Sequence, residues 1–187
     1  MLYLGTTSES LGQFSMKMKP DFISKEEYPY AVDTTSFEFK YPVDRLFTLQ
    51  DVVEEDELRR PKMLDENGER CLLVIKNGNC TGVTIGRATG PMSFVREYFE
   101  NGTHETSMML AIYSHGNKEG AFSGPSDSGS IIVDREGRVV GLLTGGAGKT
   151  GSTDPDVTYA TPFYWLLQRI KSHFPNAHLY QAMDEVS

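Results

Sequence analysis

The sequence has no long apolar run and no excess of positive charge, and each absence excludes a class of protein. No stretch of about 18 consecutive apolar residues occurs, so no segment is predicted to span a membrane. The first ten residues, MLYLGTTSES, lack the basic flank and the apolar length of a secretory signal. The formal net charge of -8 disfavours nucleic acid as a partner, because a phosphate-binding surface needs clustered lysine and arginine. The sequence therefore predicts neither a membrane nor a nucleic acid partner, and it favours the cytoplasm or assigns no location.

Cysteine is scarce as well, with only Cys71 and Cys80 in 187 residues. They bracket LLVIKNGN, whose Asn77-Gly78 is a hairpin turn signal, so the two are predicted to lie near each other on adjacent strands. Without a secretory signal we expect free thiols. No histidine and cysteine cluster has metal-ligand spacing, so no metal site is predicted. No cofactor is expected either: Gly148-Lys149-Thr150 would need a glycine where Leu143 stands to form a phosphate loop.

Small and turn-forming residues instead gather around one serine. The run Ser126-Asp127-Ser128-Gly129-Ser130 precedes an apolar strand at Ile131 to Val133, a polar turn and a second apolar run at Val139 to Thr144. This pattern predicts a β-hairpin behind the turn. Such a turn can hold Ser128 rigidly with its hydroxyl exposed. The alternative is a plain β-turn in which Asp127 and Ser128 only bond the local backbone.

Two stretches resemble one family. Asp127-Ser128-Gly129, the hairpin and then Gly141 to Gly146 resemble the nucleophile region of chymotrypsin/trypsin-like (PA-clan, S1-like) serine proteases. Upstream, Lys76-Asn77-Gly78 with Thr81 to Gly86 resembles the K-x-G-x-x-T-G-x-T-x-G run near the start of the second barrel in compact members. The resemblance implies an all-β fold: a chymotrypsin-like second barrel over about 70 to 162 with a C-terminal helix, preceded by an incomplete first barrel.

The domain boundaries follow from this comparison. Residues 1–69 are interpreted as a remnant of the first barrel and an interdomain linker, and 70–187 as the second barrel plus the helix. Further strands are predicted at Ser93 to Phe99, Ser107 to Tyr113 and Val157 to Ala160, and a short exposed helix at Val52 to Arg60. Thr161 and Pro162 are predicted to open the terminal helix, whose apolar stripe should lie on the barrel: Phe163, Leu166, Leu167, Ile170 and Phe174.

The resemblance also implies a set of site residues. Ser128 falls on the nucleophile, the N–H groups of Ser126 and Ser128 on the oxyanion hole, and Asp127 and Gly129 on its supports. The implied substrate-binding residues are Phe122, near the base of the specificity pocket, and Thr144, Gly145 and Gly146, on the edge strand that pairs with substrate backbone. One departure matters: the family has glycine where this chain has Ser126. A positive φ there costs a serine about 1–2 kcal/mol, so the turn either bears this strain or leaves the oxyanion hole unformed.

A general base for Ser128 is missing from the expected place. In this family the histidine and aspartate precede the serine, yet residues 1–103 contain no histidine. His104 and His115 belong to the predicted second barrel, and His173 and His178 lie in or after the terminal helix, so none is expected to act as the base. Aspartates upstream are not expected to replace that of the triad: Asp33, Asp44 and Asp51.

A closer resemblance accounts for this gap. The chain resembles the C-terminal portion of a group of uncharacterised trypsin-like proteins of mushroom-forming (basidiomycete) fungi, over most of residues 36–180. The matching strings are FKYPVDRL, CLLVIKNGN, TGVTIGRATG, SFVREY, LLTGGAGKT, DVTYATPFYWL and FPNAHLY. In that group the catalytic histidine and aspartate would lie before the point where this chain begins.

Two functions of different class follow. The chain is either of serine endopeptidase lineage, active only if the missing half is supplied, or a non-catalytic protease-like module that binds peptide or serves a structural role. Expected partners are a peptide or protein ligand, and a second copy or another chain that supplies the missing barrel. An apolar patch lined by residues 1–50 is predicted where that barrel would dock.

Overall fold

The computed structural model describes residues 2–3, 46–47, 49–64, 68–115, 120–147 and 156–179. Most of the region that we interpret as a first-barrel remnant lies outside these ranges, and so does the apolar patch predicted from residues 1–50, together with Asp33 and Asp44. Within residues 1–69, the strand β1 (Leu2–Tyr3) pairs antiparallel with β2 (Leu46–Phe47).

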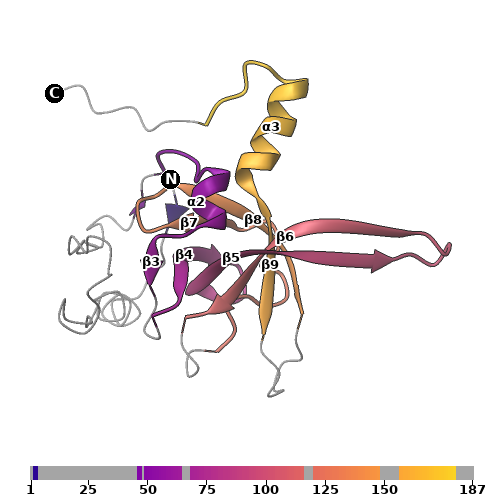
Figure 1. The fold of residues 1–187 in the computed structure, drawn as a ribbon, viewed down its shortest axis with the longest axis horizontal. Coiled ribbons are helices and arrows are strands. Elements are labelled where there is room, and N and C mark those ends of the chain that lie inside the picture. Colours follow the sequence, from indigo (N-terminus) through magenta and orange to yellow (C-terminus); the bar gives the residue numbers. More distant parts are fainter. Residues whose placement is uncertain are drawn as a thin grey trace.

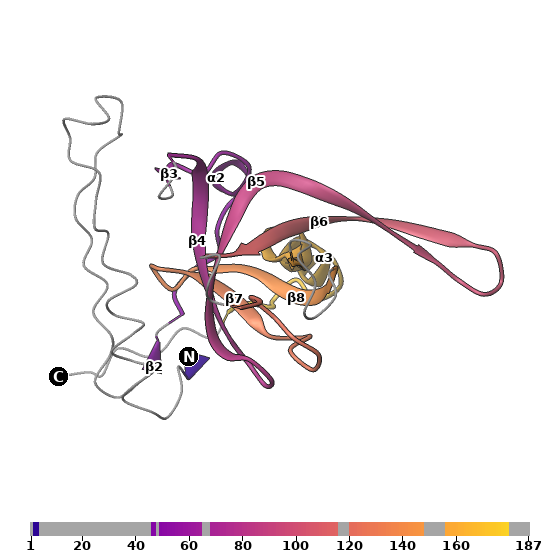
Figure 2. The same ribbon diagram turned by 90° about the horizontal axis from the view of Figure 1, so that it is seen from below.

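The remaining strands form one antiparallel sheet that closes on itself (Figures 1 and 2). Its order is β3-β4-β5-β6-β9-β8-β7, and a further pairing of β4 with β7 joins the ends of six strands into a ring. The strands are β3 (Met63–Leu64), β4 (Arg70–Gly78), β5 (Gly82–Tyr98), β6 (His104–Ser114), β7 (Ile131–Asp134), β8 (Val139–Ala147) and β9 (Val157–Pro162). The predicted all-β, barrel-like fold with one C-terminal helix is confirmed.

The first hairpin of the ring confirms the predicted strand pair but not its turn. In β4 and β5, Lys76 lies opposite Thr84 and Gly78 opposite Gly82, so the turn spans residues 79–81 rather than the predicted 77–79. Gly82 carries the positive φ of this turn, +63°, which explains the shift. The two cysteines are free, as predicted. They do not lie on adjacent strands, because Cys71 is near the start of β4 and Cys80 is in the turn beyond its end.

The second hairpin is much longer than the barrel. β5 and β6 pair from Gly86 opposite Ser114 out to Tyr98 opposite His104, with a register shift between Ala88 and Met92. Beyond this bulge the two strands leave the ring and project as a ribbon, plain in Figures 1 and 2. We define the arm as residues 92–109. The predicted turn at its tip, residues 100–104, is observed at 99–103, where the Phe99 N–H donates to the Thr103 carbonyl.

The core fills the ring and also takes in residues from the segment before it. Val74, Ile112 and Ile132 are inside the ring, on alternate positions of their strands. Val53 and Leu58, from the predicted linker, belong to the same cluster. The described residues 49–64 thus pack with the barrel as one unit, and the division of the chain at residue 69 stays a prediction.

The helix α2 (Glu55–Arg59) lies within the segment Val52 to Arg60, where a short exposed helix was predicted. It carries an i,i+4 ion pair, 2.7 Å between Arg59 and Glu55, but it is not fully exposed, because Leu58 is buried. A second pair fixes the helix to the hairpin β7–β8: Arg138 binds both carboxylate oxygens of Glu57 at 2.8 Å and also contacts Asp134. The Glu57 pKa is below its usual range, because the hydrogen bond from Arg138 outweighs burial.

The C-terminal helix α3 (Phe163–His173) begins one residue later than predicted, with Pro162 as its N-cap. Tyr164 packs against the core, yet no residue of α3 is buried, so the apolar stripe covers the barrel only in part. Trp165 is exposed and its ring stacks under the Arg169 guanidinium at 5.2 Å. Neither helix of the described ranges is both long and apolar enough to cross a membrane.

Candidate functional site

Two consecutive turns place Ser128. In the first, the Asp127 N–H donates to the Gly124 carbonyl at 3.1 Å, with Pro125 and Ser126 between them. In the second, the Ser130 N–H donates to the Asp127 carbonyl at 3.1 Å, with Ser128 and Gly129 between them. Both have a positive φ at the third residue, +76° at Ser126 and +88° at Gly129, as type II turns require. Asp127 is therefore the hinge between the turns, and Ser128 is at the outside of the second.

Ser126 bears the strain instead of avoiding it. It is the only residue other than glycine with a positive φ in the described ranges. In this part of the chain, the N–H groups of Ser126 and Ser128 donate to no acceptor, whereas the intervening Asp127 N–H is bonded within the turn. Of the two alternatives left open by the sequence, the strained turn is the one observed. Two unpartnered N–H groups flanking Asp127 can receive an oxyanion or a carbonyl oxygen.

Replacing Ser126 by glycine is expected to stabilise the protein by about 0.5–1 kcal/mol, because glycine adopts a positive φ without the clash that Cβ causes. Ser130→Gly is the matched control: its φ is ordinary and its hydroxyl donates to the Asp127 carbonyl, so it should destabilise instead. Urea unfolding of both variants measures the difference. A loss of stability in Ser126→Gly would show that the serine hydroxyl or side chain, not the backbone, governs this position.

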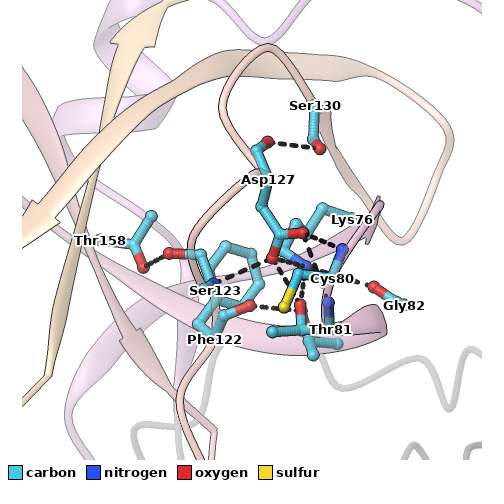
Figure 3. Close-up of polar contacts among 11 residues, drawn as sticks. Lys76, Cys80, Thr81, Gly82, Phe122, Ser123, Asp127, Ser130 and Thr158 are labelled. Atoms are coloured by element: carbon cyan, nitrogen blue, oxygen red, sulfur yellow. Dashed lines mark hydrogen bonds and ion pairs between the residues drawn. The ribbon is translucent and has the colours of Figure 1, made fainter. Parts of the chain in front are cut away.

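A buried ion pair holds the hinge of the two turns (Figure 3). The carboxylate of Asp127 lies 3.2 Å from the ammonium of Lys76, and both side chains are fully buried. Asp127 also accepts hydrogen bonds from the N–H groups of Cys80 (2.7 Å) and Gly124 (2.9 Å) and from the Thr81 hydroxyl (2.7 Å). Both oxygens of the buried carboxylate therefore have hydrogen-bond partners, as burial of a charge requires.

The ammonium is satisfied in the same way. Lys76 donates to the Thr81 hydroxyl and to the Gly82 carbonyl, and its Nζ lies 5.5 Å above the centre of the Phe122 ring. Burial raises the pKa of Asp127, but the hydrogen bond from Thr81, those from Gly124 and Cys80 and the charge of Lys76 outweigh it. The pKa of Asp127 consequently lies well below its usual range. Burial lowers the pKa of Lys76, against the attraction of Asp127.

The hydroxyl of Ser128 is exposed, and no side chain of the described residues is bonded to it as a base. Its Oγ donates to the Thr144 carbonyl at 3.3 Å. All four histidines are among the described residues, and none is bonded to the Ser128 hydroxyl. His104 packs beside Tyr98 at the tip of the arm, His173 and His178 bond carbonyls of their own helix and turn, and His115 directly follows β6. That no histidine acts as a base for Ser128 stays a prediction. Asp51 bonds the N–H of Val52.

The other predicted site residues divide into buried and open ones. Phe122 is packed in the core under Lys76, and its carbonyl accepts from the Thr84 hydroxyl at 2.7 Å. Beside it, the hydroxyls of Ser123 and Thr158 bond each other at 2.6 Å. The role of Phe122 as a pocket floor stays a prediction.

The predicted substrate strand has an unpaired edge. β8 pairs with β7 only up to Leu142, and the Gly129 N–H closes the pairing at the Leu143 carbonyl. On its other side β8 pairs with β9 as far as Ala147. Among the described residues, 144–147 therefore keep one edge without a partner strand. The position of Gly145 is open, since a Cβ there would meet nothing within 4 Å.

No protein-family model matches the chain, and no curated protein matches it. Among solved structures, part of the fold is similar to the crystal structure of Cellulomonas bogoriensis chymotrypsin, with 21% sequence identity and a TM-score of 0.39. The match covers 52% of this chain and 46% of that enzyme, so the chain spans about half of its length.

Lys76 and Thr81 are the residues of the site that sequence reasoning missed. Both belong to the K-x-G-x-x-T-G run, but nothing in that run links them to Asp127. Asp127 lies 51 residues after Lys76 and 46 residues after Thr81. The available signal was a lysine at a position that alternates with buried residues of an apolar strand. Such a lysine needs an anionic partner inside the protein.

Proposed function

We propose that this chain is a trypsin-like serine endopeptidase homologue whose Ser128 occupies the nucleophile position but has no base, so that the chain alone does not hydrolyse peptides. One observation carries the proposal: in the part of the chain that the structure describes, a strained turn presents two unpartnered N–H groups beside an exposed serine hydroxyl whose one hydrogen-bond partner is a carbonyl. Nucleophilic catalysis by serine requires a base within hydrogen-bond reach. The turn supports oxyanion binding, and the hydroxyl stays unactivated.

Reaction of the chain with a fluorophosphonate probe tests this proposal. Labelling of the wild type is expected to be as slow as that of Ser128→Ala, because the oxyanion hole and binding alone give at most about 10³ to 10⁴ over water. An active serine hydrolase in the same tube is the positive control for the probe. Rapid labelling that disappears in Ser128→Ala would contradict the proposal, since it would require a base that acts on this hydroxyl.

The free edge of β8 favours a second function, binding of a peptide without cleavage. An extended peptide can add a strand to residues 144–147, and Gly145 leaves room for it. Calorimetric titration with extended peptides, followed by mass spectrometry of the peptide, tests this second function. Binding with intact peptide supports the non-catalytic module, and lack of binding contradicts it. Cleaved peptide contradicts both functions, because neither includes hydrolysis by this chain alone.

A further inference from the structure

The tip of the arm carries a sequence pattern that neither proposed function uses. Asn101-Gly102-Thr103 fits the acceptor pattern for N-glycosylation, an asparagine followed two residues later by serine or threonine. All three residues are exposed, and they form the end of the ribbon that projects from the barrel (Figures 1 and 2). An enzyme that attaches a glycan there can reach the asparagine without contacting the barrel.

The turn holds the side chain of Asn101 in one orientation. Its Oδ1 atom accepts hydrogen bonds from the Thr103 hydroxyl at 2.6 Å and from the Thr103 N–H at 3.0 Å. Its Nδ2 atom, to which a glycan is joined in N-glycosylation, donates to no acceptor among the described residues. The amide nitrogen is therefore free, and the hydroxyl that the acceptor pattern requires lies against the same side chain.

An exposed aromatic ring lies on the same face of this turn. The Phe99 N–H donates to the Thr103 carbonyl, which continues the register in which Tyr98 lies opposite His104. The side chains of Phe99 and Thr103 therefore share one face of the ribbon. Because the Thr103 hydroxyl also binds the Asn101 amide, a sugar on Nδ2 begins beside the Phe99 ring, which is 40% exposed.

The backbone of the turn fixes this arrangement. The Gly102 N–H donates to the Phe99 carbonyl at 3.0 Å, and Gly102 has a φ of +79°. These are the features of a hairpin loop in which a type I turn is followed by a glycine in the left-handed region. A short loop of this kind leaves the acceptor little freedom to move away from the aromatic ring.

The same pattern occurs once more, at Asn79-Cys80-Thr81, but there the hydroxyl is already in use. The Thr81 hydroxyl donates to Asp127 at 2.7 Å and accepts from Lys76, within the buried ion-pair site. It is therefore not available beside the asparagine of this first hairpin turn. The structure favours the tip of the arm as the site of attachment.

We propose that Asn101 is an N-glycosylation site and that the ring of Phe99 packs against the first sugar. In the transfer, Nδ2 forms a bond to the anomeric carbon of N-acetylglucosamine, and the bond from this carbon to the diphosphate of a lipid-linked oligosaccharide breaks. Nδ2 loses one proton, and the lipid diphosphate leaves with the electron pair. The C–H groups on one face of the sugar cover the ring. They give the tip of the arm the second layer that a two-stranded ribbon lacks.

The proposal assigns the chain to the secretory pathway, where N-glycans are attached, in place of the cytoplasm that its first ten residues favour. The two free thiols are compatible with this route. Cys71 is near the start of β4 and Cys80 is beyond its end, so most of a nine-residue strand separates them. An extended strand of that length holds them too far apart for a disulfide in any compartment.

Mass spectrometry of the full chain, purified from the cells that produce it naturally, tests the site. Peptides are compared before and after treatment with peptide N-glycosidase, which converts a glycosylated asparagine to aspartate. We expect conversion at Asn101 and none at Asn79. A chain in which Asn101 is unmodified overturns the proposal, whether or not Asn79 carries a glycan.

Hydrogen exchange of the glycosylated chain tests the contact with Phe99. Enzymatic removal of the glycan should increase the exchange of arm amides about fivefold, the effect of losing one aromatic contact, and should leave residues 86–88 unchanged. In Phe99→Ala, removal of the glycan should change nothing. Phe94→Ala is the matched control, because this ring is also exposed on the arm but further from its tip, and it should respond as the wild type does. Equal responses of the wild type and Phe99→Ala overturn the contact.

Discussion

Replacing Lys76 by methionine is expected to lower the free energy of unfolding by about 3–5 kcal/mol, the range found when one partner of a buried ion pair is removed. The reason is the fully buried carboxylate of Asp127, which would lose the one counter-charge that the described residues give it while remaining in the protein interior. Its four remaining hydrogen-bond donors would moderate the loss but could not neutralise the charge. Guanidinium unfolding of the purified chain measures the change.

Lys62→Met is the matched control, because Lys62 is exposed and makes no buried pair. It should change the stability by less than about 0.5 kcal/mol. If Lys76→Met were equally mild, Asp127 would have to be neutral in the folded protein, and the assignment of its lowered pKa would be wrong. A second probe reports on the site itself: in Lys76→Met the pKa of Asp127 should rise, since the ammonium that lowers it is gone.

Gly78→Ala is expected to destabilise the protein by about 3 kcal/mol, at the upper end of what overpacking usually costs. A Cβ at Gly78 would lie 2.4 Å from Oδ1 of Asp127 and 2.7 Å from Nζ of Lys76. Neither atom can retreat without leaving the ion pair. The φ of Gly78 is not in the left-handed region, so lack of space rather than backbone strain decides the result.

Gly145→Ala is the control for this substitution, because it is also a strand glycine without a positive φ, and a Cβ there meets nothing. Thermal unfolding of the two variants side by side should show a large decrease in melting temperature for Gly78→Ala only. Equal effects would mean that β4 can shift away from the pair, and that the glycine is not needed for the close approach of Asp127.

The strands of the ring were predictable because β-branched and apolar residues alternate in them. The small residues around Ser128 predicted one turn, whereas the structure has two consecutive turns there. The first turn was misplaced by two residues because Asn77-Gly78 is a strong local signal, whereas pairing with β5 keeps Gly78 in the strand. The apolar stripe of α3 predicted packing, but a stripe does not tell how much of it another element will cover. Leu58 lies in a run of acidic and basic residues that predicted an exposed helix. Its burial depends on contacts with residues far along the chain.

The partner of Lys76 could not have been predicted locally. The residue stands in an apolar strand, and it is tolerated there because the turn before β7, which pairs with β4 to close the ring, places the carboxylate of Asp127 beside it. Likewise, the two strands of the arm were predicted, but their projection from the barrel was not. The apolar and polar residues of the arm alternate as they do in a strand that lies on a barrel. Only the register and the exposure of Phe94 distinguish the two.

The bulge in β5 divides one continuous strand into two regions of different local stability. At its centre Gly90 has a φ of +89°, and a Cβ there would lie 2.7 Å from the carbonyl of Arg59, at the end of α2. Residues 86–88 are paired with β4 on one side and β6 on the other, so their amides open only when the ring opens. Residues 92–98 have β6 alone beside them, so the arm can fray and reform while the barrel, Asp127 and the serine it supports remain folded.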